Sequence, residues 1–224
     1  MKLLPIVAAA CLSVLLAGCI ESDLINSDTV SSEAVVGLPT DAATRLTMYD
    51  VEAGQWTDSL VVVPFSSAEG RFVYHLSDDW EIDFADAKDE LEGGGALWGT
   101  LIAADLGDGN YFARVYYGED DVAQVGILLS YEGKQLVFSP NAFGPNMAED
   151  MLKAFPEESK SEPASQQNKV LTFSETGGLV QINLETIDQA RTVAEAIRER
   201  YPTFTSEEAF NGFGMVFAPV HDAQ

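Results

Sequence analysis

Residues 97–117 have the sequence LWGTLIAADLGDGNYFARVYY, which predicts a β-hairpin. Two strand-forming segments, Leu97–Ala104 and Tyr111–Tyr117, flank a short stretch that contains Asp108 and Gly109. An Asp-Gly pair tolerates the positive φ angles that tight hairpin turns require. Strands joined by so short a loop must run antiparallel, because a parallel return needs a much longer connection. The hairpin therefore favours an antiparallel sheet.

The segments on both sides extend this hairpin into a meander. Downstream, Val122–Tyr131 and Lys134–Ser139 form a second predicted hairpin across a Glu-Gly turn. Upstream, residues 60–65 are a continuous apolar run, and residues 72–76 alternate between two faces. Residues 79–84 alternate acidic and apolar side chains, which is typical of a strand with one face in water.

Two helices are predicted in the C-terminal half of the chain. Asn146 and Glu149 have the spacing of a capping box, and the apolar face that follows ends before Pro156. Thr186 and Gln189 form a second capping box, which opens a longer amphipathic helix. The predicted fold class is α+β: an antiparallel β-meander of about six to eight strands, with one longer C-terminal helix and one shorter helix packed on one face.

Residues 37–155 are predicted to form an antiparallel β-rich domain with a terminal helix. Residues 156–168 are rich in glutamate, serine, glutamine and lysine, and predict an exposed loop. Residues 169–224 are predicted to form a C-terminal strand–helix–strand segment of the same domain. Two domains divided at the loop are the alternative.

The N-terminus has the pattern of an export signal. Lys2 precedes the uncharged apolar run Leu3–Ala17, which is too short for an ordinary membrane span. The run ends in Leu16-Ala17-Gly18-Cys19, which resembles the lipobox of bacterial lipoproteins. The resemblance implies that residues 1–18 are removed as a signal peptide, that the sulfur of Cys19 is diacylated and that the new amine usually takes a third acyl chain. An ordinary secretory signal and an uncleaved helix are the alternatives.

Residues 19–36 contain few large apolar side chains and predict a flexible tether between the lipid and the folded body. In many Gram-negative lipoproteins an aspartate after the lipidated cysteine favours retention in the inner membrane, whereas this chain has Ile20. The resemblance therefore favours the outer membrane, with the body facing the periplasm. The only other cysteine, Cys11, lies within the signal, so no disulfide is expected in the exported part.

The composition is strongly acidic, with a formal net charge of −24. Removal of residues 1–18 takes away one charged side chain, Lys2, and leaves 11 basic and 36 acidic ones. This charge argues against nucleic acid as a partner, because phosphate backbones would be repelled. A protein with a basic patch or another cationic ligand remains compatible.

No motif in the sequence indicates a catalytic, cofactor or metal site. His75 and His221 lie in no nucleophile motif, and Asp105–Asn110 lacks the spacing of a calcium loop. The sequence therefore favours a lipid-anchored, non-enzymatic interaction module with an acidic surface. One alternative is a carboxylate-pair hydrolase of envelope glycan, which would use acids clustered at residues 78–79, 86–92 or 119–121. The other alternative is a protein that binds a cation or basic ligand.

Overall fold

The structure of the chain is a computed structural model. It describes residues 18–22, 24, 34–38, 44–50, 55–66, 72–77, 99–117, 123–131, 135–139, 141–142, 144–158, 169–173, 179–203 and 215–219. The hydrophobic part of the signal, the predicted strand at residues 79–84, His221 and most of the 156–168 loop lie outside these residues. No helix in the described part of the chain is long and apolar enough to cross a membrane.

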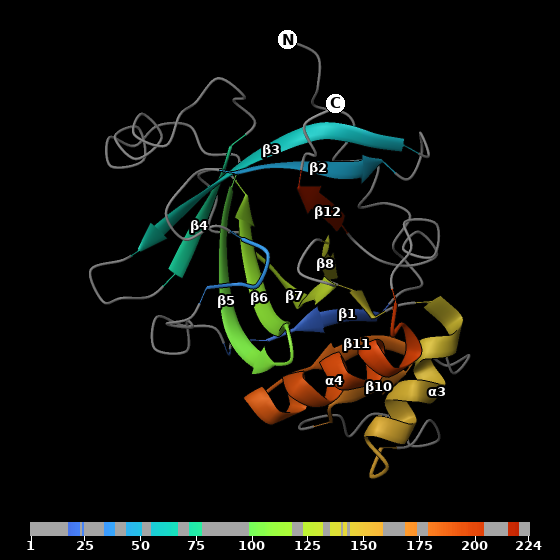
Figure 1. The fold of residues 1–224 in the computed structure, drawn as a ribbon. Helices are drawn as coiled ribbons and strands as arrows, with labels where there is room; N and C mark the ends of the chain where they lie inside the picture. Colours follow the sequence, from blue (N-terminus) through green and yellow to red (C-terminus); the bar gives the residue numbers. More distant parts are fainter. Residues whose placement is uncertain are drawn as a thin grey trace.

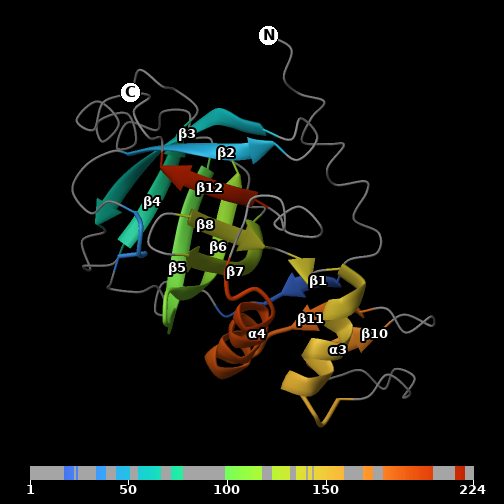
Figure 2. The same ribbon diagram turned by 45° about the vertical axis from the view of Figure 1, so that its right-hand side comes forward.

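Eight antiparallel strands form a closed barrel, in which β12 pairs with both β2 and β8 and so completes the ring (Figures 1 and 2). Seven of these strands follow one another as a meander, as the short connections of the two hairpins predicted. The strands are β2 (Thr44–Asp50), β3 (Gln55–Ser66), β4 (Phe72–Ser77), β5 (Gly99–Gly107), β6 (Asn110–Tyr117), β7 (Ala123–Tyr131), β8 (Gln135–Ser139) and β12 (Met215–Pro219).

Strand alternation divides the barrel side chains between an inner and an outer core. The inner core fills the lumen, and the strands contribute to it Leu46, Val62, Tyr74, Leu76, Leu101, Ala103, Tyr111, Ala113, Val115, Leu128, Leu136 and Phe138. The side chains that alternate with these, such as Phe112, Ile127 and Leu129, point outwards into a second buried cluster. Where the outer cluster covers the barrel, the strands are therefore buried on both their inner and outer faces.

The outer cluster lies between the barrel and a second layer of one small sheet and two helices (Figure 2). The small sheet has the order β10-β11-β1-β9, and β1 pairs in parallel with β11. Its elements and the helices are β1 (Gly18–Glu21), β9 (Asn141–Ala142), β10 (Leu171–Phe173), β11 (Leu179–Asn183), α3 (Gly144–Ala154) and α4 (Ile187–Arg200). The α+β prediction of a meander with two helices is confirmed, and closure of the meander into a barrel was not predicted.

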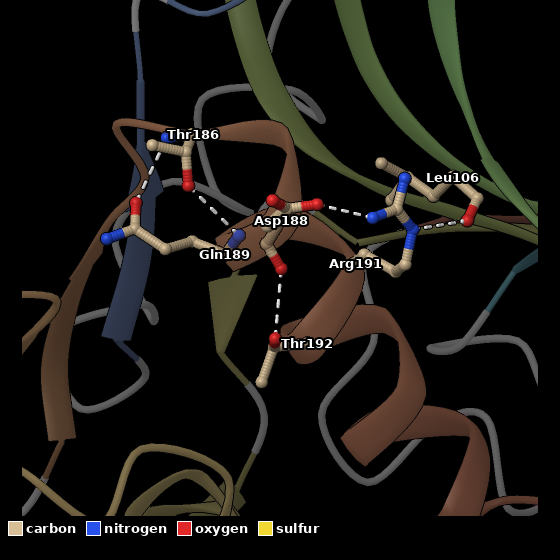
Figure 3. Close-up of polar contacts among 6 residues, drawn as sticks. All are labelled: Leu106, Thr186, Asp188, Gln189, Arg191 and Thr192. Carbon is tan, nitrogen blue, oxygen red and sulfur yellow. Dashed lines mark hydrogen bonds and ion pairs between the residues drawn. The ribbon is translucent and has the colours of Figure 1, made fainter.

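Helix α4 begins at the predicted capping box (Figure 3). The Thr186 hydroxyl accepts a hydrogen bond from the Gln189 amide at 3.2 Å, and the Gln189 side chain accepts one from the Thr186 amide at 3.0 Å. These bonds satisfy amide groups that have no partner within the helix. The cap fixes the start of α4, and Ala190, Val193, Ala194 and Ile197 then face the outer cluster, where they are fully buried.

The first residues of the stretch 19–36, for which a flexible tether was predicted, lie in a strand. Residues 18–21 form β1, which lies between β11 and β9, and Ile20 is only 4% exposed. Ser22 extends the attachment, because its hydroxyl donates a 2.6 Å hydrogen bond to the Leu184 carbonyl and its own carbonyl accepts one from Arg114. The polar composition hid these contacts, because a single buried isoleucine is enough to dock so short a strand. Residues 18–22 thus pack against the folded body at the start of the stretch for which a tether was predicted.

The C-terminal segment contributes to both layers. β10, β11 and α4 belong to the outer layer, whereas β12 returns to the barrel between β2 and β8. Along residues 169–224 the described elements are β10, β11, α4 and β12, in that order.

Candidate functional site

A short irregular segment, residues 34–38, lies in contact with the inner core of the barrel. Val35 is 2% exposed and Leu38 is 8% exposed, and both belong to the inner core of the barrel. Val36, which lies between them, is 50% exposed. The segment turns on itself, since the Leu38 amide donates a 3.0 Å hydrogen bond to the Val35 carbonyl. Figures 1 and 2 show it as the short blue stretch next to β5, away from the helices. We call residues 34–38 the lumen segment.

Two tyrosines of the barrel wall hold the lumen segment. The Tyr74 hydroxyl, from β4, accepts a 3.0 Å hydrogen bond from the Val35 amide. The Tyr111 hydroxyl, from β6, accepts a 2.8 Å hydrogen bond from the Val36 amide. Burial raises the pKa of Tyr74 to about 12, and the hydrogen bond from Val35 offsets this only in part. The Tyr74 hydroxyl therefore stays neutral at physiological pH.

One further polar group faces the lumen without a partner. Ser130 follows Leu128 by two residues on β7, so strand alternation places its side chain on the inner face. The residue is 7% exposed, and its Oγ atom is buried with no hydrogen-bond partner. Buried hydroxyls are normally hydrogen-bonded, and an unpaired one costs about 1–3 kcal/mol.

The second layer carries a surface pocket of about 520 Å³ between α3 and α4. Its charged lining comprises Asp150, Lys153, Glu195, Glu199 and Arg200. The Asp150 carboxylate is already paired with Lys153 at 3.2 Å and with Arg200 at 2.7 Å. These two ion pairs occupy the Asp150 carboxylate, so it is not available as a metal ligand.

Of the two histidines and the acid clusters singled out for chemistry, the structure describes only His75. His75 is half-buried on β4, its Nδ1 lies 3.4 Å from the Thr100 hydroxyl, and burial lowers its pKa. The acids at residues 78–79, 86–92 and 119–121 lie outside the described residues. Among the described residues, no group of three or more histidine, cysteine, aspartate or glutamate side chains could hold a metal ion.

The stretch that resembled a calcium loop forms the turn between β5 and β6. Asp108 has φ of 55° and Gly109 has φ of 73°, the two positive values of a type I′ hairpin turn. The Asp105 carboxylate accepts a 2.9 Å hydrogen bond from the Gly107 amide, so it is used within the turn. The hairpin interpretation of this stretch is confirmed.

Position 19, the predicted lipidation site, lies within β1. Its register partners are Gln181 on β11 and Asn141 on β9. The sequence resemblance found this position, but no sequence signal indicated that it would join a sheet.

Comparison of the chain with protein family models, curated protein sequences and solved structures gives no match. The functional argument therefore depends on the residues of this chain alone.

Proposed function

We propose that the protein is a lipid-anchored, non-enzymatic interaction module of a bacterial cell envelope, attached to the outer membrane through Cys19 and facing the periplasm. The observation that carries the proposal is the Leu16-Ala17-Gly18-Cys19 sequence at the end of an apolar run. Two or three acyl chains hold a protein on a bilayer far more firmly than one chain, since each buried CH₂ contributes about 0.8 kcal/mol.

The position of β1 supports a short attachment. Cleavage before Cys19 would make the first residue of the mature chain a member of β1, paired with Gln181 and followed by the buried Ile20. The acyl chains would then be attached directly to the small sheet, without a free spacer. We therefore propose that the small sheet sits next to the headgroups while the barrel extends away from them.

The charge supports a partner of opposite sign. With 36 acidic and 12 basic residues, the chain attracts basic protein surfaces and is repelled by anionic headgroups. On the second layer, the exposed carboxylates include Glu149, Glu195 and Glu199. Such a surface increases the rate of association with a basic patch, and the effect weakens as salt rises.

The anchor is tested with two cysteine variants of the full chain expressed in a Gram-negative host. Cys19→Ser should remove the acyl modification from the N-terminal peptide in mass spectra and release the protein from the membrane fraction. Cys11→Ser is the matched control, because Cys11 lies inside the discarded signal, and it should leave lipidation unchanged. An unmodified N-terminal peptide from the parent protein in the membrane fraction would refute the anchor.

The interaction role needs its own experiment. Crosslinking in intact cells should capture a protein partner with a basic surface, and the yield should fall when ionic strength is raised. Turnover of an envelope glycan by the purified protein, with loss of activity when clustered acids are replaced, would instead favour the hydrolase.

A further inference from the structure

The barrel can accommodate more than its own side chains. Eight-stranded barrels have an interior just wide enough to be filled by side chains or to hold one small ligand. Here part of the filling comes from Val35 and Leu38, which belong to the lumen segment and not to the barrel wall. Two of the wall positions facing the lumen, Ala103 and Ala113, carry only a methyl group. The interior is therefore completed by a piece of chain that forms no part of the ring.

The lumen segment is attached differently from every barrel strand. It has no strand pairing, and its amides donate to two side-chain hydroxyls, those of Tyr74 and Tyr111. A strand of the barrel is held by a ladder of backbone hydrogen bonds along its length. Residues 34–38 can therefore leave the lumen without breaking the barrel, provided that something else fills the apolar space and satisfies the hydroxyls.

The chemistry of the lumen selects the class of molecule that could do so. The wall contributes apolar side chains, and Tyr74 and Tyr111 contribute hydroxyl groups. Burying a charge in such surroundings is costly unless it is paired, so a charged ligand is disfavoured. The buried Oγ of Ser130, which has no partner, offers one more hydrogen bond to a molecule in the lumen. These groups fit a neutral, mainly apolar ligand that carries one or more hydrogen-bonding atoms.

We propose that the barrel lumen is a binding site for a small neutral apolar molecule, and that residues 34–38 occupy this site when the ligand is absent. The ligand replaces the side chains of Val35 and Leu38, and its polar atoms replace the amides of Val35 and Val36 at the two tyrosine hydroxyls. The site lies in the barrel and does not depend on the lipid anchor.

A pair of neighbouring valines gives a matched test. Val35→Asp places a carboxylate at a position that is 2% exposed and should expel the lumen segment, whereas Val36→Asp makes the same change at a position that is 50% exposed. Both are made in the full chain carrying Cys19→Ser, so that no acyl chains bind the probe. The probe is N-phenyl-1-naphthylamine, a neutral apolar molecule that fluoresces when it is removed from water.

Val35→Asp should bind the probe saturably and at least tenfold more tightly than Val36→Asp, which should behave as the parent does. Equal binding by the two variants, with Val35→Asp still folded by circular dichroism, would overturn the proposal.

Amide hydrogen exchange of the parent chain, measured with and without saturating probe, tests whether the probe displaces residues 34–38 from the lumen. This test needs no destabilising substitution. Exchange at residues 34–38 should become at least severalfold faster when the probe is bound, because the amides of Val35 and Val36 lose their acceptors. Amides of β5–β7 should become slower. Unchanged or slower exchange at residues 34–38 with saturating probe would overturn the proposal, whatever the variants do.

Discussion

The guanidinium carbon of Arg198 lies 4.5 Å from the centroid of the Tyr131 ring, and this contact joins helix α4 to the barrel. The same guanidinium donates to Asn110 Oδ1, at 2.8 Å from Nε and 2.6 Å from Nη2, and to the Ser130 and Gly109 carbonyls at 3.2 Å. Tyr131 is fixed in turn, because its hydroxyl donates a 3.0 Å hydrogen bond to the Tyr201 carbonyl. One arginine thus fastens the C-terminal part of α4 to two strands and a turn.

Arg198→Ala should lower the free energy of unfolding by about 2–4 kcal/mol, because it takes both donors from the buried Asn110 side chain and removes the ring contact. Chemical denaturation measures the change. Arg191→Ala is the control on the same helix: Arg191 donates to one buried carbonyl, that of Leu106, and pairs with the exposed Asp188. Arg191→Ala should lower the free energy of unfolding by about 1 kcal/mol. A loss for Arg198→Ala no greater than that for Arg191→Ala would contradict the role of Arg198.

The features that the sequence predicted correctly are those that local chemistry decides. The Asp108-Gly109 turn follows from the positive φ that these residues tolerate, and the start of α4 follows from the hydrogen bonds of Thr186 and Gln189. Short connections then imposed an antiparallel meander. Each of these signals involves residues within a few positions of one another.

The unpredicted features depend on contacts between distant parts of the chain. β12 closes the barrel by pairing with β2, and the Val35 amide meets Tyr74, which lies 39 residues away. Val35 and Val36 are the same residue type in adjacent positions, yet one is buried and the other exposed. No local pattern distinguishes them, so the lumen segment could not be recognised from the sequence. Only the lipidation position among the candidate functional residues had a local signature.

Gly109→Ala should destabilise the protein by about 1–2 kcal/mol, because an added Cβ disfavours the φ of 73°. That Cβ would also lie 3.3 Å from the Ser130 carbonyl oxygen, a close approach that adds to the cost. Asp108→Gly is the control, since glycine accepts the φ of 55° at that position, and its stability should stay within about 0.5 kcal/mol of the parent. Thermal and chemical denaturation should rank the two variants alike, and a stable Gly109→Ala protein would argue against the type I′ turn.

The buried tyrosines predict a loss of stability at alkaline pH. Burial raises the pKa of Tyr74 and of Tyr131 from 10.0 to about 12. Between these values the unfolded chain releases protons that the folded chain retains, so stability is complete below pH 10 and falls as pH rises towards 12. The denaturation midpoint should therefore drop more steeply between pH 9.5 and about 11.5 for the parent than for Tyr74→Phe or Tyr131→Phe. If the denaturation midpoint falls equally with pH in all three proteins, burial does not raise the pKa of either hydroxyl.

Docking of β1 through Ile20 leads to the last prediction. Ile20 is 4% exposed, belongs to the outer cluster and pairs in register with Ile182. Ile20→Ala should cost about 2–4 kcal/mol, because it removes buried methyl groups and leaves a cavity. Val180→Ala is the control on the neighbouring strand β11, where the side chain is 46% exposed, and it should cost less than about 0.5 kcal/mol. Equal, small losses of stability for the two variants would show that β1 does not contribute to the folded body. The proposed anchor would then be joined to the body through a free linker and not through the small sheet.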